Sequence, residues 1–217
     1  MQPSVLFRKL RSAKTRLRQA LLSQRFGVAP STIYDDAFYD GPGCAQGKAG
    51  AAAVAAVLHE RFKPKSMFDF GCGTAGILEA MAARGVEAFG CEGSEHAVRR
   101  CSPSVVVFQA DLKRPVHLNR KFELVTCIEV AEHLPKRCEG TLVQSMVDAS
   151  DHRIVFSASG PGQLGDDHIN LQPPEHWARL FEAHGYRWLR DESRDLRRAF
   201  EAAQAPHWFQ NAIVLER

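Results

Sequence analysis

A glycine-rich turn between an apolar stretch and a helix-forming stretch most constrains the fold of this 217-residue chain. Residues 66–70 have the composition of a short buried strand, and they lead into the segment Asp69-Phe70-Gly71-Cys72-Gly73-Thr74-Ala75-Gly76. Glycines at this spacing let a ligand approach the backbone where a strand ends and a helix begins. The turn therefore predicts an α/β domain with a ligand site at its first strand.

Strand-like and helix-like stretches alternate along the chain. Seven strands are predicted, at residues 66–70, 88–91, 105–109, 124–128, 153–157, 186–190 and 212–216. Helices are predicted at residues 48–62, 75–84, 95–100, 141–148, 174–184 and 196–203. Pro64, Gly85 and Gly185 each end one of these helices. The alternation predicts a doubly wound, mostly parallel seven-stranded sheet with helices on both faces.

The first 47 residues differ from the rest. Seven basic residues precede the first acid, Asp35, so a leader with seven positive charges is followed by a remainder with a net charge of −4. Residues 4–25 have the apolar spacing of an amphipathic helix, and residues 27–47 read as a loop with three aromatic residues, Tyr34, Phe38 and Tyr39. We expect residues 1–47 to form a helical cap over the site and residues 48–217 to form the domain itself.

The basic face of this leader allows more than one interpretation. It is explained most simply as a solvated helix face, although it could also contact an anionic substrate, a nucleic acid or a membrane surface. No apolar run reaches the roughly 18 residues of a membrane span, and the six cysteines form no C-x-x-C pair. We therefore expect a soluble, cytoplasmic protein with reduced thiols. Nothing in the sequence indicates its oligomeric state.

Asp69 and Glu92 distinguish between the ligands that the glycine turn admits. The same turn binds the pyrophosphate of dinucleotides, but those sites do not require an acid two residues before the first glycine. An acid there favours a cationic ligand instead. Glu92 follows an apolar strand sixteen residues after Gly76, where a carboxylate accepts two ribose hydroxyls, and Gly93 leaves room beside it. A nicotinamide oxidoreductase is further disfavoured because no tyrosine has Tyr-x-x-x-Lys spacing.

These motifs together resemble those of class I S-adenosylmethionine (SAM)-dependent methyltransferases. In that family the glycine loop backs onto the methionine part of SAM, and the preceding acid helps to hold its ammonium group. Ala110-Asp111-Leu112 is similar to the loop that meets the adenine amino group, and residues 122–135, which include Glu129, look like the fourth strand and its loop. The resemblance covers about residues 34–217. The four motifs occur in the expected order.

The resemblance implies a Rossmann-like fold with SAM as the cofactor and S-adenosylhomocysteine (SAH) as the product. The cofactor-binding residues that it implies are Asp69, Gly71, Cys72, Gly73, Gly76, Glu92, Gly93, Asp111, Leu112 and Glu129.

Two histidines are candidates for the chemical step. Methyl transfer from a sulfonium is an in-line displacement, so the enzyme mainly positions the acceptor, and a hydroxyl acceptor must also lose its proton. His133 and His168 follow the fourth and fifth strands, at the edge where open α/β sheets bind ligands, and either could be a general base. We prefer His168, because its polar, glycine-flanked loop argues against a place in the core. His133 could instead pack or cap a helix beside the cofactor.

Glu129-x-x-Glu132-His133 also resembles the metal-binding signature of ubiquinone-pathway O-methyltransferases and of small-RNA 2′-O-methyltransferases. His168 would complete a set of two carboxylates and two imidazoles around a divalent ion. The same spacing occurs in members that bind no metal. A divalent metal is therefore possible but not favoured, and no residue is assigned as a metal ligand.

The later segments resemble bacterial methyltransferases of sugar, glycan and secondary-metabolite pathways. They include residues 156–163, residues 167–173 and Trp208-Phe209-Gln210-Asn211. We expect O-methylation of a small-molecule or saccharide hydroxyl. The alternatives are N-methylation of a small metabolite, 2′-O-methylation of RNA and a catalytically silent SAM-binding module. RNA is not favoured, because few aromatic residues are interleaved with basic ones.

Overall fold

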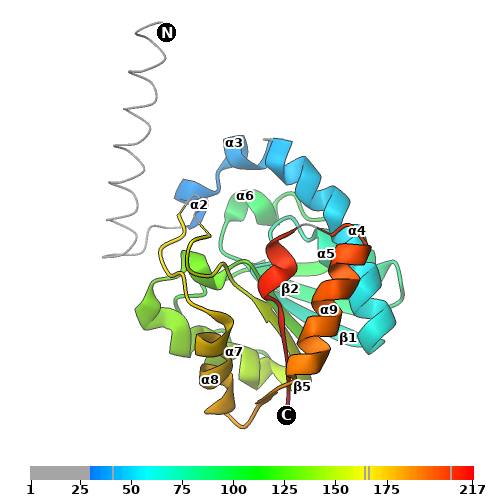
Figure 1. Cartoon of the computed structure of the whole chain (residues 1–217). Coiled ribbons are helices and arrows are strands. Elements are labelled where there is room, and N and C mark those ends of the chain that lie inside the picture. Colours follow the sequence, from blue (N-terminus) through cyan, green and yellow to red (C-terminus); the bar gives the residue numbers. More distant parts are fainter. Residues whose placement is uncertain (1–29, 41, 164, 166, 206) are drawn as a thin grey trace, which may run out of the picture.

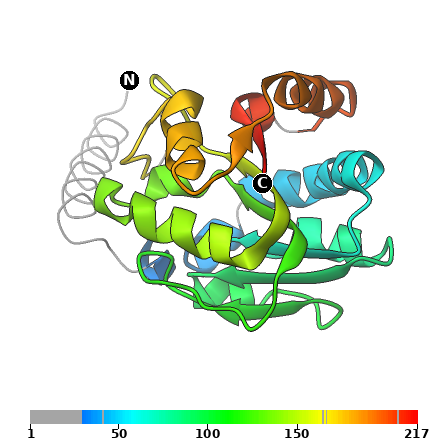
Figure 2. The ribbon, with the colours of Figure 1, turned by 90° about the horizontal axis from the view of Figure 1, so that it is seen from below.

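The computed structural model describes residues 30–217 apart from residues 41, 164, 166 and 206 (Figure 1). The amphipathic helix expected at residues 4–25 lies outside the described residues. Within the described part, one seven-stranded sheet lies between helices (Figures 1 and 2). The helices of that part are too short or too polar to cross a membrane.

The sheet has the strand order β3-β2-β1-β4-β5-β7-β6. The strands are β1 (Ser66–Phe70), β2 (Glu87–Glu92), β3 (Val106–Gln109), β4 (Phe122–Ile128), β5 (Ser150–Ser157), β6 (Arg187–Trp188) and β7 (Ile213–Glu216). Strands β1 to β5 are parallel, whereas β7 is antiparallel to both β5 and β6. The predicted mostly parallel sheet is therefore confirmed. The strand order reverses at β1, so the carboxyl ends of β1, β2 and β4 meet where open sheets bind ligands.

Helices bury both faces of this sheet. Helices α4 (Pro42–Phe62), α5 (Gly76–Ala82) and α9 (Arg190–Ala202) pack in one hydrophobic core, and α7 (Glu139–Ala149) and α8 (Pro174–Glu182) pack in the other. All five residues of β1 are buried, as expected for a central parallel strand covered on both sides. Phe68 and Phe70 point into the second core, whereas Met67 points into the first. β1 therefore anchors the glycine turn between two packed layers.

The elements of the cap region begin earlier than the sequence indicates. α4 begins at Pro42 rather than at residue 48, so it crosses the boundary that we placed after residue 47. The expected loop contains two short helices, α2 (Pro30–Ile33) and α3 (Asp36–Tyr39). The Asp35 carboxylate accepts a hydrogen bond from Phe38 N at 3.0 Å and so forms an N-cap that starts α3. The division into cap and domain stays a prediction.

The last strand–helix boundary also differs from the predicted one. The strand expected at residues 186–190 is only Arg187–Trp188, and α9 begins at Arg190 rather than at residue 196. Asp191 and Glu192 favour the N-terminal end of a helix, and the Ser193 hydroxyl accepts a hydrogen bond from Trp188 Nε1 at 3.0 Å. Residues 193, 196 and 200 face the core. Because α9 has so few apolar residues on its buried face, the sequence pattern did not predict its first turns.

Gly90 of β2 gives a test of the packing between β1, β2 and α5. A Cβ at Gly90 would lie 2.7 Å from Leu78 Cδ1 and 2.9 Å from the backbone oxygen of Asp69. Because that oxygen belongs to β1, Gly90→Ala should lower the free energy of unfolding by about 1–3 kcal/mol in urea titrations. Gly140→Ala in α7 is the control, because a Cβ there meets no described atom within 4 Å. Equal losses in both variants would contradict this assignment.

Candidate functional site

A cavity of about 330 Å³ opens at the carboxyl ends of β1, β2 and β4. The turn after β1, the ends of β2 and β4 and the loop after β3 form its base, and α2 and α3 contribute to its wall. Seven of the predicted cofactor residues line it: Gly71, Gly73, Glu92, Gly93, Asp111, Leu112 and Glu129. Asp69, Cys72 and Gly76 are not among the lining residues. The structure thus gathers most of the predicted cofactor residues at one cavity.

The glycine turn leaves its backbone open towards this cavity. Gly71 and Gly73 have φ angles of 78° and 54°, in the left-handed region that favours glycine. Gly71 N donates to Cys91 O at 2.8 Å, which ties the turn to β2. A Cβ on Gly71 would lie 2.5 Å from Val130 Cγ2, whereas one on Gly73 would meet none of the described atoms within 4 Å. Gly71 is needed for packing, and Gly73 presents bare backbone to a ligand.

Glu92 connects the turn to the end of β2. It is 8% exposed; its Oε2 accepts from Gly73 N at 2.9 Å and its Oε1 accepts from Ser94 N at 2.8 Å. Burial raises the pKa of Glu92, and these backbone donors oppose that rise. Each carboxylate oxygen keeps a second lone pair. Glu92 can therefore hold the turn and still accept two hydroxyl groups.

Asp69 lies behind the turn rather than on the cavity wall. Thr126 Oγ1 donates to Asp69 Oδ1 at 2.6 Å, across the pairing of β1 with β4. Burial raises the pKa of Asp69 from 3.8 to about 6, the Thr126 hydrogen bond lowers it, and the charge of Glu92 raises it. The observed contact of Asp69 is thus structural. Its contact with a cofactor ammonium group stays a prediction.

Two further carboxyl groups follow β4. Glu129 has a φ angle of 55°, a strained conformation for a residue with a side chain, and it accepts from Ser157 Oγ at 2.8 Å and Ser159 Oγ at 2.9 Å. Glu132 is 0% exposed; its Oε1 accepts from Ser159 N at 3.1 Å, and its Oε2 has no hydrogen-bond partner among the described residues. Burial and the charge of Glu132 raise the pKa of Glu129 to about 8. This pair favours a nearby cation.

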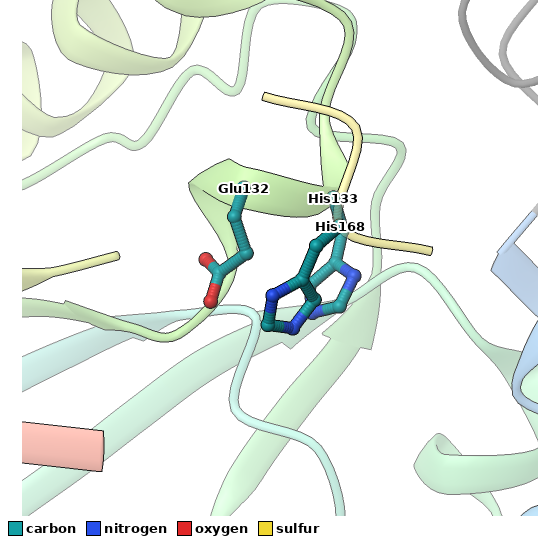
Figure 3. Close-up of side chains that lie close together, drawn as sticks. All are labelled: Glu132, His133 and His168. Atoms are coloured by element: carbon teal, nitrogen blue, oxygen red, sulfur yellow. The ribbon is translucent and has the colours of Figure 1, made fainter. Parts of the chain in front are cut away.

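Both candidate histidines lie beside this acidic pair. His133 belongs to the short 3₁₀ helix η1 (Ala131–His133), and His168 comes from the loop after β5 (Figure 3). Their ring centroids are 4.9 Å apart. His133 lines the cavity, whereas His168 lies between two lining residues, Asp167 and Ile169. The fold thus brings together two residues that are far apart in the sequence.

Hydrogen bonds bear on which nitrogen of each ring carries a proton. His168 Nδ1 lies 2.8 Å from Gln163 O, and His133 Nδ1 lies 3.2 Å from Asp167 O and 2.8 Å from the Tyr34 hydroxyl. Because a carbonyl oxygen only accepts, the Gln163 contact requires a proton on His168 Nδ1, whereas the Tyr34 hydroxyl can either donate to His133 Nδ1 or accept from it. Burial, followed by the neighbouring His168, lowers the pKa of His133 to about 4. His133 is therefore neutral at pH 7.

Three of these side chains could hold a metal ion. One ligand atom from each of Glu132, His133 and His168 lies within 4.8 Å of the other two (Figure 3). One carboxylate and two imidazoles suit a divalent transition metal. The unpaired Glu132 Oε2 is a buried acceptor for which a cation would be a partner. Glu129, whose pKa is raised by burial and by the charge of Glu132, is a second carboxyl group near this cluster.

The cap joins the site through aromatic rings. Tyr39, Phe38, Tyr34, His133 and His168 form a row in which each ring meets the next edge to face. Ser94 Oγ donates to Tyr34 O at 2.6 Å. Arg100, just after α6 (Glu95–Val98), pairs with Asp36 and Asp40 of the cap. Pro30, Ile33, Tyr34, Phe38 and Tyr39 therefore form part of the cavity wall.

Sequence reasoning missed the residues that support the acids and the histidines. Ser157 and Ser159 hold Glu129, Thr126 holds Asp69, and Tyr34 contacts His133 across 99 positions of the chain. Strand register is the signal that could have found the first of these, because Ile128 pairs with Ser157 in the parallel β4–β5 ladder. The contact between Tyr34 and His133 has no counterpart in a local pattern.

The strand order, the glycine turn after β1 and the acid that ends β2 define the class I SAM-dependent methyltransferase fold. The sequence model of the methyltransferase domain family matches residues 46–190, more than half of the chain, and the chain belongs to this family. The predicted family is thereby confirmed. No curated protein sequence matches the chain.

Solved structures of similar fold support the same class. A SAM-dependent methyltransferase from Archaeoglobus fulgidus is 17% identical with a TM-score of 0.61, covering 84% of this chain and 100% of its own. SAM-bound CalS10, an amino pentose methyltransferase from Micromonospora echinaspora, is 16% identical with a TM-score of 0.60, covering 84% and 95%. The sugar N-methyltransferase KedS8 from Streptoalloteichus is 19% identical with a TM-score of 0.58, covering 84% and 92%. At these identities the likeness shows the fold.

The raised pKa of Glu129 predicts a pH-dependent stability. Its pKa is about 8 in the folded protein, against 4.5 for an ordinary glutamate, so between these values the folded state holds a proton that the unfolded state releases. The free energy of unfolding therefore falls as pH rises from 4.5 to 8. Because glutamine does not ionise, Glu129→Gln should gain in thermal stability over wild type as pH rises from 5 to 8, in chelator-containing buffer.

The matched control is Glu182→Gln, which changes an exposed glutamate of α8. The difference between its melting temperature and that of wild type should stay constant over the same pH range. If the difference between Glu129→Gln and wild type did not grow with pH, the assignment of a protonated Glu129 would be wrong.

Proposed function

We propose that this methyltransferase transfers the methyl group of SAM to a hydroxyl group of a small molecule or saccharide. The observation that carries the proposal is a cavity whose acidic, glycine-lined cofactor cradle lies beside His133, with the ring of His168 packed against His133 and its Nδ1 bound to Gln163 O. The cradle accounts for the cofactor. The histidines account for an acceptor that must lose a proton.

The lining residues fit SAM in shape and in charge. Gly73 presents backbone with no obstructing side chain, and Glu92 has two oxygens that each retain a lone pair for ribose. Asp111 lines the cavity just after β3, in the loop where an adenine amino group is expected. Glu92 and Glu129 offer acceptor oxygens to this cavity, and a sulfonium or ammonium group beside them would favour their ionised forms. When bound, SAM supplies the electrophilic methyl group.

The two histidines have different proposed roles, one as a general base and the other in orienting the acceptor. A hydroxyl is a weak nucleophile until its proton is removed, and His168 Nε2 is the proposed acceptor of that proton. His133 is the weaker base near neutral pH, because its pKa is lowered to about 4. Its Nδ1 is bound by Tyr34 and Asp167, so His133 is better suited to orienting the acceptor.

Substitution of Glu92 tests the cofactor cradle. Glu92→Gln keeps the shape of the side chain but removes its charge, and charge-assisted hydrogen bonds contribute about 1.5–3 kcal/mol each. SAH affinity by titration calorimetry should therefore fall about tenfold or more. Glu87→Gln at the other end of β2 is the control, because Glu87 is exposed and pairs with Arg120 at 2.8 Å. An unchanged affinity in Glu92→Gln would refute the proposed cradle.

A methyl-transfer screen tests the reaction itself. Wild-type protein with methyl-labelled SAM should label a saccharide or phenolic hydroxyl among sugars, phenols, amines and RNA. Labelling of RNA alone would favour the nucleic-acid alternative. If SAH bound but no acceptor of any class became labelled, the silent binding module would be the better description.

N-methylation of an amino sugar is the second candidate. Two proteins of similar fold are named as an amino pentose methyltransferase and a sugar N-methyltransferase, which favours this acceptor class. An amine attacks through its own lone pair, and a histidine can take up the proton afterwards. In the same screen this candidate requires label on an amino sugar and none on the matching sugar without the amine.

The clustered ligands also favour a divalent ion more than the sequence pattern alone does. Glu132, His133 and His168 would hold it, and it would polarise the acceptor hydroxyl. Wild-type protein should bind Mn²⁺ in a paramagnetic resonance titration. His168→Gln should weaken that binding about tenfold or more, whereas His117→Gln, at an exposed site, should not. Full activity after treatment with chelator would remove the ion from the reaction.

A further inference from the structure

The segment before the last strand reaches the loop that carries His168. The 3₁₀ helix η3 (His207–Asn211) leads into β7, and β7 lies beside β5 in the sheet. Asn211 therefore lies next to the chain that leaves β5, where its Nδ2 donates to Ala158 O at 3.1 Å and to Gln163 Oε1. Asn211 is not among the residues that line the cavity. Its effect on the site can only be indirect.

Gln163 links Asn211 to His168. Its Oε1 accepts from Asn211 Nδ2 and from Gly160 N, and its own N donates to Gly160 O at 3.0 Å. The side chain and the amide of Gln163 are thus both bound, and its carbonyl accepts from His168 Nδ1 at 2.8 Å. Two amide side chains therefore anchor the residue whose carbonyl meets His168.

That carbonyl group decides the tautomer of His168. A neutral imidazole carries one proton, which can sit on either nitrogen, and only the Nδ1–H form can donate to an oxygen that accepts. The Gly165 backbone lies beside the Nε2 edge of the ring, where a Cβ would be only 2.4 Å from Nε2, so only glycine fits at this position. The Gln163 contact leaves the lone pair of a neutral His168 on Nε2.

We infer that Asn211 and Gln163 are positioning residues that hold His168 in the Nδ1-protonated tautomer, so that Nε2 serves the acceptor. The inference rests on the role proposed for His168. It assigns a function to the C-terminal Asn211, which the cofactor motifs do not include. Neither amide needs to touch the cofactor or the acceptor.

Three variants separate positioning from general stability. Asn211→Asp keeps the size of the side chain but replaces its donor with an oxygen that faces two acceptors. Gln163→Leu removes Oε1, the oxygen that accepts from Asn211 Nδ2 and Gly160 N. This second variant still tests the inference if Asn211→Asp does not fold. Gln163→Glu is the matched conservative variant, because its carboxylate still accepts from Gly160 N and Asn211 Nδ2.

The direct measurement is nuclear magnetic resonance of the histidine ring nitrogens at neutral pH, with His168 assigned by its loss in His168→Gln. Wild type and Gln163→Glu should show one Nδ1-protonated ring. Asn211→Asp and Gln163→Leu should show a mixture of tautomers. Their turnover should fall about tenfold, part of the roughly 10²–10⁴-fold that a positioned base contributes, with SAH affinity unchanged.

Unchanged His168 nitrogen signals in both disruptive variants would overturn the inference, and so would an equal loss in Gln163→Glu and Gln163→Leu. The proposed function is judged separately by methyl transfer in the wild type. A wild-type protein that transfers no methyl group would contradict that function, whereas the nitrogen signals would still decide whether the amide pair controls the tautomer.

Discussion

The burial of four carboxyl groups at one edge of the sheet is the constraint on which the rest of the site depends. Burial raises the pKa of Asp69, Glu92, Glu129 and Glu132, so each group is held there against the preference of its charge for water. Such an arrangement is stable only where hydrogen-bond donors or a cation compensate it. The donors present are few, and one oxygen of Glu132 has none among the described residues. A cationic cofactor, a metal ion or both would compensate the ionised forms of these buried acids.

The parallel sheet supplies those donors because of its strand order. Asp69 on β1 is opposite Thr126 on β4, and Glu129 after β4 is beside Ser157 at the end of β5. Each acid is therefore supported by the next strand rather than by its own neighbours in the sequence. Glu92 combines both kinds of support, because Gly73 N of the turn after β1 and Ser94 N, two residues along the chain, both donate to it. Reversal of the strand order at β1 places Glu92 and Glu129 at one cavity, with the Asp69–Thr126 pair behind the turn.

This dependence on neighbouring strands explains how far the sequence predicts the molecule. The glycine turn, the seven strands and Glu92 follow from local composition and spacing, and the structure agrees with them to within a few residues. The predicted start of α9, at residue 196, was wrong because only residues 193, 196 and 200 form its buried face. The contacts of Tyr34 with His133 and of Asn211 with Gln163 join segments 99 and 48 residues apart, so no local pattern contains them. The sequence predicts candidate binding groups, whereas the fold determines which residues hold those groups in place.

The cofactor side of the site and the histidine side of the site differ in charge. The half formed by the turn, Glu92 and Asp111 is acidic and suits a cation, whereas His133 is kept neutral by burial and by its neighbour His168. A neutral ring can take a proton only through a nitrogen whose lone pair is free, so the hydrogen bond at Nδ1 matters as much as the pKa. For His168 that bond comes from Gln163, which is held by the C-terminal Asn211. In the proposed function, the segments from β1 to β4 hold the cofactor, and His133 after β4 and His168 after β5 serve the acceptor.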